Sequence, residues 1–79
     1  MYLHLGEDTI VSKNEIIGIF DIENTSVSKI TKDFLAGKNF EVITVSYEIP
    51  KSFILTESNG NVKVYISNIS PQTLKKRNK

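Results

Sequence analysis

The sequence predicts a single α+β domain over residues 1–79: a small antiparallel β-sheet built from short strands and hairpins, a covering helix at about 26–36 and a short C-terminal helix. Most of the chain consists of short runs of strand-forming residues separated by turn residues. Residues 26–36 instead have the spacing of a helix with one apolar stripe. The chain has no cysteine, so its small core must hold without disulfides.

The first 22 residues predict three strands. Residues 2–5 and 9–12 form an N-terminal hairpin around a turn at residues 6–8. Residues 15–22 are dense in β-branched side chains and are predicted as the third strand. Parts of this run also have helical spacing, but Gly18 weakens a helix and the run is short.

A helix is predicted next. Val27, Ile30 and Phe34 recur at helical spacing, and the polar residues 23–26 can accept hydrogen bonds from the first free N–H groups. Gly37 follows as a C-cap that adopts the left-handed conformation. The apolar stripe is narrow, which favours a helix laid with one face on a sheet.

The strongest local signal is Ser52–Ser67, in which two strand-forming runs flank Asn59-Gly60. This dipeptide suits the positive φ angles of a type I′ hairpin turn, and the turn places Leu55 opposite Val64. Alternation then predicts two faces of the hairpin. The core face consists of Phe53, Leu55, Val62, Val64 and Ile66. The other face is mixed and consists of Ile54, Thr56, Lys63 and Tyr65.

Two elements flank this hairpin. Residues 40–46 predict a strand, and Pro50 marks residues 47–51 as a connection because proline cannot donate to a central ladder. After the hairpin, Ser70 as N-cap, Pro71 at the first helical position and cations in the last turn predict a short terminal helix.

The charges are distributed unevenly although the net charge is only +1. Residues 1–24 carry one lysine and five acidic residues (−4), whereas residues 52–79 carry five basic residues and one glutamate (+4). This asymmetry suits an anionic partner for the tail or head-to-tail contact between copies; a solvated, fraying C-terminus is the simpler interpretation.

Catalytic chemistry is not indicated. His4 is the sole histidine, Glu7 and Asp8 are neighbours in a turn, and no glycine-rich phosphate loop occurs. We therefore expect a protein that is not an enzyme and has no cofactor, metal site or small-molecule substrate. The chain has no apparent signal peptide and its apolar runs are too short to cross a membrane, so we expect no membrane association and a cytoplasmic location.

The basic end of the chain is the remaining candidate for binding. Phosphate contacts need only surface cations, so double-stranded DNA is a possible partner, with Lys51, Lys75, Lys76 and Arg77 as the candidate DNA-binding residues. One copy has few such charges, but several copies would multiply them. Apolar residues also exceed what one sheet face and one helix can bury, which predicts a homo-oligomer, in a ring or otherwise; the surplus residues are Ile17, Ile19, Ile22, Ile49 and Ile54.

Five stretches carry a family likeness along nearly the whole chain: Met1–Ser12, Ile16–Asp21, Ile30–Leu35, Lys51–Thr56 and Ser70–Arg77. They resemble the RemA/RemB-like family of small extracellular-matrix (biofilm) regulators found in Firmicutes, with the RemB branch closest. The resemblance implies a non-enzymatic cytoplasmic regulator whose RemA relatives form rings and bind DNA as activators of transcription.

The same resemblance exposes two departures. RemA relatives carry adjacent arginines after the tyrosine matching Tyr47, where this chain continues with residues 48–51 (EIPK), and an arginine at the position of Glu15. Both changes remove positive charge.

The expected function is regulation of matrix gene expression by a homo-oligomer with multivalent DNA-phosphate contacts. The alternative is a protein–protein interaction module that modulates another regulator.

Overall fold

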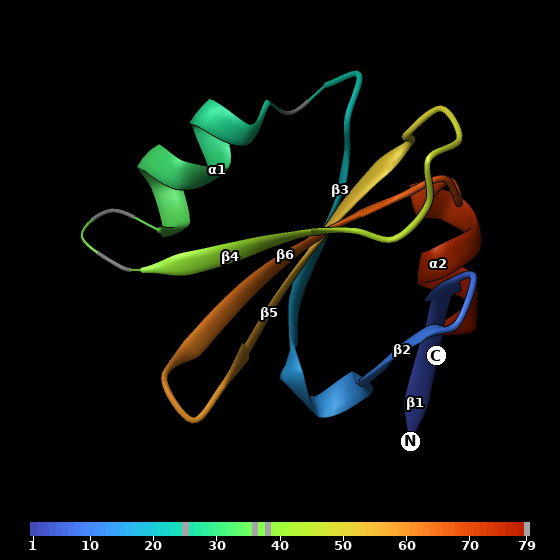
Figure 1. The fold of residues 1–79 in the computed structure, drawn as a ribbon, viewed down its shortest axis with the longest axis horizontal. Helices are drawn as coiled ribbons and strands as arrows, with labels where there is room; N and C mark the ends of the chain where they lie inside the picture. Colours follow the sequence, from blue (N-terminus) through green and yellow to red (C-terminus); the bar gives the residue numbers. More distant parts are fainter. Residues whose placement is uncertain (25, 36, 38, 79) are drawn as a thin grey trace.

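The computed structural model describes residues 1–24, 26–35, 37 and 39–78, without the side chains of residues 27, 30, 31 and 34. Six strands form two sheets (Figure 1). In chain order the elements are β1 (Tyr2–Gly6), β2 (Thr9–Ser12), the 3₁₀ helix η1 (Lys13–Glu15), β3 (Ile16–Asp21), α1 (Val27–Phe34), β4 (Phe40–Thr44), β5 (Ser52–Ser58), β6 (Asn61–Ser67) and α2 (Pro71–Arg77).

The β5–β6 hairpin has the predicted turn and register. Asn59 and Gly60 both have positive φ, at 52° and 83°, as a type I′ turn requires. Leu55 pairs with Val64, and the predicted core face is buried as one cluster: Phe53, Leu55, Val62 and Val64 with Leu35, and Ile66 packed against them.

Replacing Gly60 with alanine is expected to lower the free energy of unfolding by about 1–2 kcal/mol, because an L-residue is strained at positive φ. Urea denaturation followed by circular dichroism measures this change. Gly60→Asn is the matched control, since asparagine tolerates the left-handed region, and it should cost clearly less. Equal losses in the two variants would contradict a conformational cause.

The larger sheet is mixed, so the prediction of an antiparallel sheet is wrong. Its strand order is β3-β5-β6-β4, and β4 runs parallel to β6. The segment 45–51 carries the chain past the end of β6, where the N–H of Val45 donates to the carbonyl of Ile66 at 2.9 Å. β4 therefore lies beside β6 and not beside β5. Between these two parallel strands the chain passes through segment 45–51 and β5, which together form the long connection that parallel strands require.

The predicted α+β class with a covering helix at about 26–36 is also wrong, because the described part of the chain is mostly β and α1, the helix in that range, does not cover the sheet. α1 forms within the predicted range but extends only about 12 Å, whereas β5 extends about 20 Å. Its described side chains Ser28, Lys29, Lys32 and Asp33 are exposed, and Figure 1 shows α1 on the side of the molecule away from α2.

The face predicted to be mixed carries a second core. Ile54 is fully buried there in a cluster with Leu3, Leu5, Val11, Val45 and Leu74, so the β1–β2 hairpin and α2 together cover this side of β5. Ile19 packs against this cluster and Ile22 against the other. Of the apolar residues predicted to be in surplus, only Ile17 and Ile49 remain largely exposed, at 52% and 82%.

A buried hydrogen bond attaches the small sheet to the large one. Ser67, fully buried at the end of β6, donates its hydroxyl to the carbonyl of Leu5 at 2.6 Å.

Among the described residues, no helix is long and apolar enough to cross a membrane.

Candidate nucleic-acid interface

The predicted terminal helix is confirmed, and its ends are well defined. Ser70 is the N-cap, and its hydroxyl oxygen accepts from the N–H of Thr73 at 3.3 Å. Pro71 occupies the first turn of α2, where a backbone N–H would have no partner within the helix. Leu74 is completely buried in the cluster beneath the hairpin, so α2 is held against the body of the protein.

The last turn of α2 presents three consecutive cations, Lys75, Lys76 and Arg77, which are all exposed. Their place at the C-terminal end of the helix dipole is favourable for positive charge. Because Leu74 anchors the turn, these side chains start from a fixed backbone and not from a frayed tail. Figure 1 shows this end of the chain on the same side of the molecule as the start of β1.

Lys51 lies elsewhere. Its N–H donates to the carbonyl of Ser67 at 2.8 Å, and its carbonyl accepts from the N–H of Ile22 at 3.2 Å, so it sits where β5 begins and β6 ends. Ser67 precedes the start of α2, and the helix then runs about 9 Å to Arg77. The structure therefore places Lys75, Lys76 and Arg77 together in the last turn of α2, whereas the backbone of Lys51 pairs with Ser67, which precedes that helix.

Loop 45–51 exposes two large apolar side chains, Tyr47 at 100% and Ile49 at 82%. Hydrogen bonds nevertheless brace the loop: the Glu48 N–H donates to the Ser46 hydroxyl at 3.1 Å, and the Asn68 amide donates to the Glu48 carboxylate at 2.6 Å. Sequence reasoning identified Ile49 as a surplus apolar residue, but it did not predict the hydrogen bonds that hold the loop around it.

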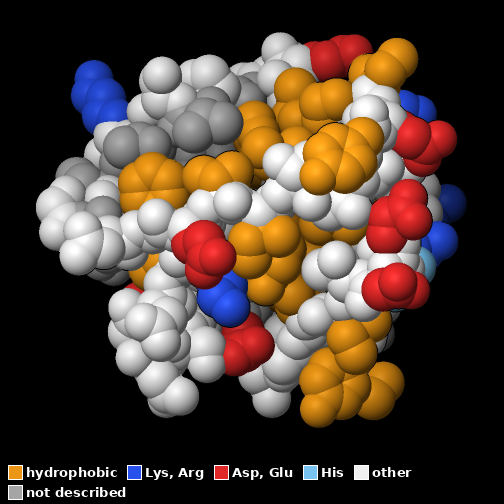
Figure 2. Space-filling view, viewed as in Figure 1, with side chains coloured by type: hydrophobic (Ala, Val, Ile, Leu, Met, Phe, Trp, Pro, Cys, Tyr) orange, Lys and Arg blue, Asp and Glu red, His pale blue; other side chains and the backbone are white. Residues whose placement is uncertain are grey.

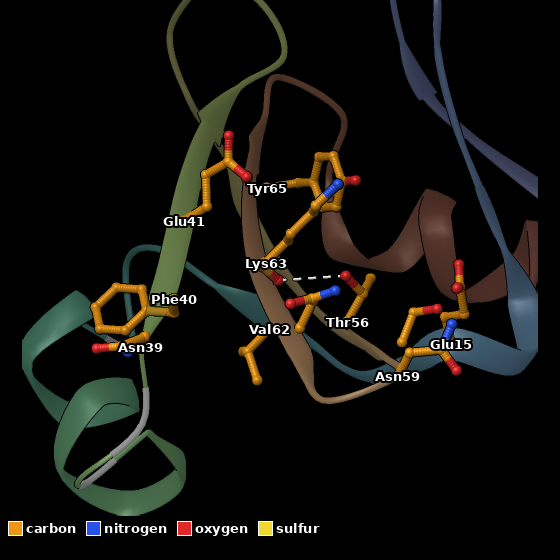
Figure 3. A pocket seen from close by; sticks show the side chains of 11 residues that line it. Glu15, Asn39, Phe40, Glu41, Thr56, Asn59, Val62, Lys63 and Tyr65 are labelled. Atoms are coloured by element: carbon orange, nitrogen blue, oxygen red, sulfur yellow. Dashed lines mark hydrogen bonds between the residues drawn. The ribbon is translucent and has the colours of Figure 1, made fainter.

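A groove of about 530 Å³ opens at the other end of the large sheet, near the β5–β6 turn (Figure 3). Thr56 supports its floor by donating its hydroxyl to the carbonyl of Lys63 at 3.4 Å. Its walls mix charged, amide, hydroxyl and aromatic groups, from Glu15, Asn39, Phe40, Glu41, Thr56, Ser58, Asn59, Asn61, Val62, Lys63 and Tyr65. Sequence reasoning missed the groove because its walls come from four separate elements.

The N-terminal turn at residues 6–8 forms as predicted, and its neighbour His4 is exposed. The Nε2 atom of His4 lies 2.7 Å from the carbonyl oxygen of Glu7. Glu7 and Asp8 are exposed in the turn between β1 and β2. In the described part of the chain, no three histidine, cysteine or acidic side chains gather where they could hold a metal ion.

The sequence model of the RemA-like family, described as extracellular matrix regulatory protein A-like, matches residues 2–77. The chain belongs to this family. Extracellular matrix regulatory protein B of Bacillus subtilis (strain 168) is 40% identical over 77 residues, which cover 98% of this chain and 89% of that protein. The resemblance inferred from the sequence, including its RemB branch, is thereby confirmed.

In this RemA-like chain, three of the places where charged side chains reach the surface are the last turn of α2, loop 45–51 and the groove. Figure 2 shows hydrophobic side chains at several points of one face, with acidic and basic side chains next to one another between them. The last turn of α2 is the one of the three whose charged side chains are exclusively cationic.

Proposed function

We propose that this RemA-like protein regulates extracellular-matrix gene expression in the cytoplasm by contacting DNA phosphates, without catalysing a reaction. The observation that carries the proposal is the last turn of α2, where Lys75, Lys76 and Arg77 are exposed on a helix anchored by buried Leu74. Family membership and the 40% identity to extracellular matrix regulatory protein B supply the regulatory context. Lys51 is left out of this contact because it lies beyond the other end of α2.

Three cations per copy make a weak contact with DNA, so the proposal includes a homo-oligomer. Each copy adds its own basic turn, and the second and later turns bind at the high effective concentration set by the first. Phosphate contacts carry no sequence information by themselves, so such an assembly would read the position and shape of the duplex more than its bases.

Removing two tail lysines tests the proposal. Lys75→Ala/Lys76→Ala should weaken binding to a mixed-sequence duplex and lower the slope of log affinity against log salt by about 2 for each copy engaged, since each phosphate contact contributes about 0.9. Fluorescence anisotropy at several salt concentrations measures both effects.

The matched control is Lys29→Ala/Lys32→Ala, which removes two exposed lysines from α1 and so makes the same change in net charge. It should leave the affinity and the salt slope close to those of the wild type. No binding of the wild type even at low salt, or equal losses in both double variants, would contradict the proposed interface.

A protein–protein interaction module is the second candidate, and the exposure of Tyr47 and Ile49 favours it. Large apolar side chains at the centre of an interface supply affinity that salt does not screen. Binding to a protein partner that persists at high salt, together with no binding to DNA, would support this alternative over the first.

A further inference from the structure

The turn between β5 and β6 contains the one Asn-Gly pair of the chain. The side-chain amide of an asparagine can be attacked by the backbone nitrogen of the residue that follows it. Glycine hinders this attack least, because it has no side chain beside that nitrogen. Asparagine is also one of the thermolabile residues that proteins from very hot environments contain less often. The turn that fixes the register of the hairpin therefore carries a chemically labile side chain.

The structure leaves this pair open to reaction. Asn59 and Gly60 are both exposed. The last pair of the β5–β6 ladder is Ser58 with Asn61, so the peptide bond between Asn59 and Gly60 lies outside the ladder. Apart from its chain neighbours, a Cβ atom at Gly60 would meet no other group within 4 Å. Neither the ladder nor a packed neighbour shields the Gly60 backbone.

Asn61 provides an internal comparison two residues further along. It is exposed as well and lines the same groove, but its backbone pairs with Ser58 in the ladder. The next residue is Val62, which is buried and whose branched Cβ crowds its own backbone nitrogen. The two asparagines thus share their exposure and differ in the nitrogen that would attack them.

We propose that Asn59 is a site of spontaneous deamidation. The Gly60 nitrogen attacks Cγ of Asn59 and gives up its proton, a succinimide ring closes, and the side-chain nitrogen leaves as ammonia. Water then opens the ring. Opening at the side-chain carbonyl gives aspartate, whereas opening at the main-chain carbonyl gives isoaspartate, in which the chain runs through the former side chain. The net reaction consumes water, releases ammonia and needs no oxidant, reductant or enzyme.

The aspartate product changes the groove and keeps the turn. Asp-Gly is, like Asn-Gly, a preferred pair for a type I′ turn, so the strands keep their register. Asn59 lines the groove, where the charged side chains among the described lining residues are Glu15, Glu41 and Lys63 (Figure 3). A further carboxylate increases the excess of negative charge there, so the groove repels anions more strongly.

The isoaspartate product changes the turn itself. It adds a methylene group to the main chain between β5 and β6, and a lengthened turn cannot join the strands in the same register. Leu55 and Val64 face each other in that register, and both are buried. This product should therefore loosen the core beneath the hairpin.

Peptide mapping by mass spectrometry, after incubation of the folded protein at neutral and mildly alkaline pH, tests the site. Asn59 should be converted roughly tenfold faster than Asn61, because valine hinders a nitrogen that glycine leaves open. The rate should rise with pH, since the attacking nitrogen must lose its proton. Absence of conversion at Asn59, or equal conversion at Asn61, would overturn the proposal.

Urea denaturation of the separated products tests the consequence. Asn59→Asp is the matched reference, because it has the new charge without the longer main chain, and it should unfold near the wild-type midpoint. The isoaspartate product should unfold at a lower urea concentration. If its midpoint equals that of Asn59→Asp, the inferred effect on the turn is wrong.

The inference goes beyond the proposed function and does not depend on it. Deamidation requires neither DNA nor a second copy, and the exposed cations Lys75, Lys76 and Arg77 lie on α2 and not at the turn. Asn59→Asp should therefore leave the salt slope of DNA binding unchanged. Each of the two proposals can fail in its own experiment without affecting the result of the other.

Discussion

Replacing Ile54 with alanine is expected to lower the free energy of unfolding by about 2–5 kcal/mol, which is enough to unfold much of a domain of this size. Ile54 is completely buried where β5, the β1–β2 hairpin and α2 meet. The small sheet and the terminal helix both pack on its side of β5, so the cavity would loosen both at once.

Urea denaturation of the two proteins measures the difference. Ile17→Ala removes the same atoms from a half-exposed position on β3 and should cost less than about 1 kcal/mol. If the two substitutions cost the same, the second core between the sheet and α2 would not contribute as the structure indicates.

Replacing Ser67 with alanine is expected to lower the free energy of unfolding by about 1–3 kcal/mol, a large effect for the loss of one oxygen atom. The buried Ser67 hydroxyl donates to the carbonyl of Leu5 at 2.6 Å and accepts from the N–H of Ile69 at 3.0 Å. Alanine would leave both of these backbone groups without that partner, and one of them holds the N-terminal hairpin to the large sheet.

A graded series checks the cause. Ser52 is equally buried but makes one hydrogen bond through its hydroxyl, to the carbonyl of Ile69 at 2.8 Å, and Ser28 on α1 is exposed. Thermal unfolding should therefore rank the alanine variants Ser67, Ser52 and Ser28 in order of decreasing destabilisation. A Ser28 variant as unstable as the Ser67 variant would show that the hydrogen bonds are not responsible.

The features that sequence reasoning predicted correctly depend on neighbours along the chain. The turn at Asn59-Gly60, the cap at Ser70 and the positive φ of Gly37 each follow from contacts or steric limits within a few residues. The three tail cations were found as a group for the same reason, since they are consecutive on one turn. The features predicted wrongly, the covering helix and the antiparallel sheet, depend on segments far apart in sequence.

The candidate binding residues also include some that local sequence signals identify and some whose placement depends on the tertiary structure. Lys51 was grouped with the tail cations on charge alone, but its backbone pairs with Ser67, which precedes α2, whereas the cations lie in the last turn of that helix. The groove could not have been predicted, because it forms only when Glu15, Glu41 and Lys63 are brought together from η1, β4 and β6.

Turn chemistry, capping and alternation act locally, so the strands, the register of the β5–β6 hairpin and the terminal helix could be predicted from the residues, and the family from its characteristic stretches. The position of β4 beside β6, and the second core on the side of β5 that bears Ile54, could not be predicted in this way. They could not because hydrophobic burial is not directional. An apolar side chain must be covered, but its identity does not specify whether a helix, a hairpin or a second copy of the chain covers it.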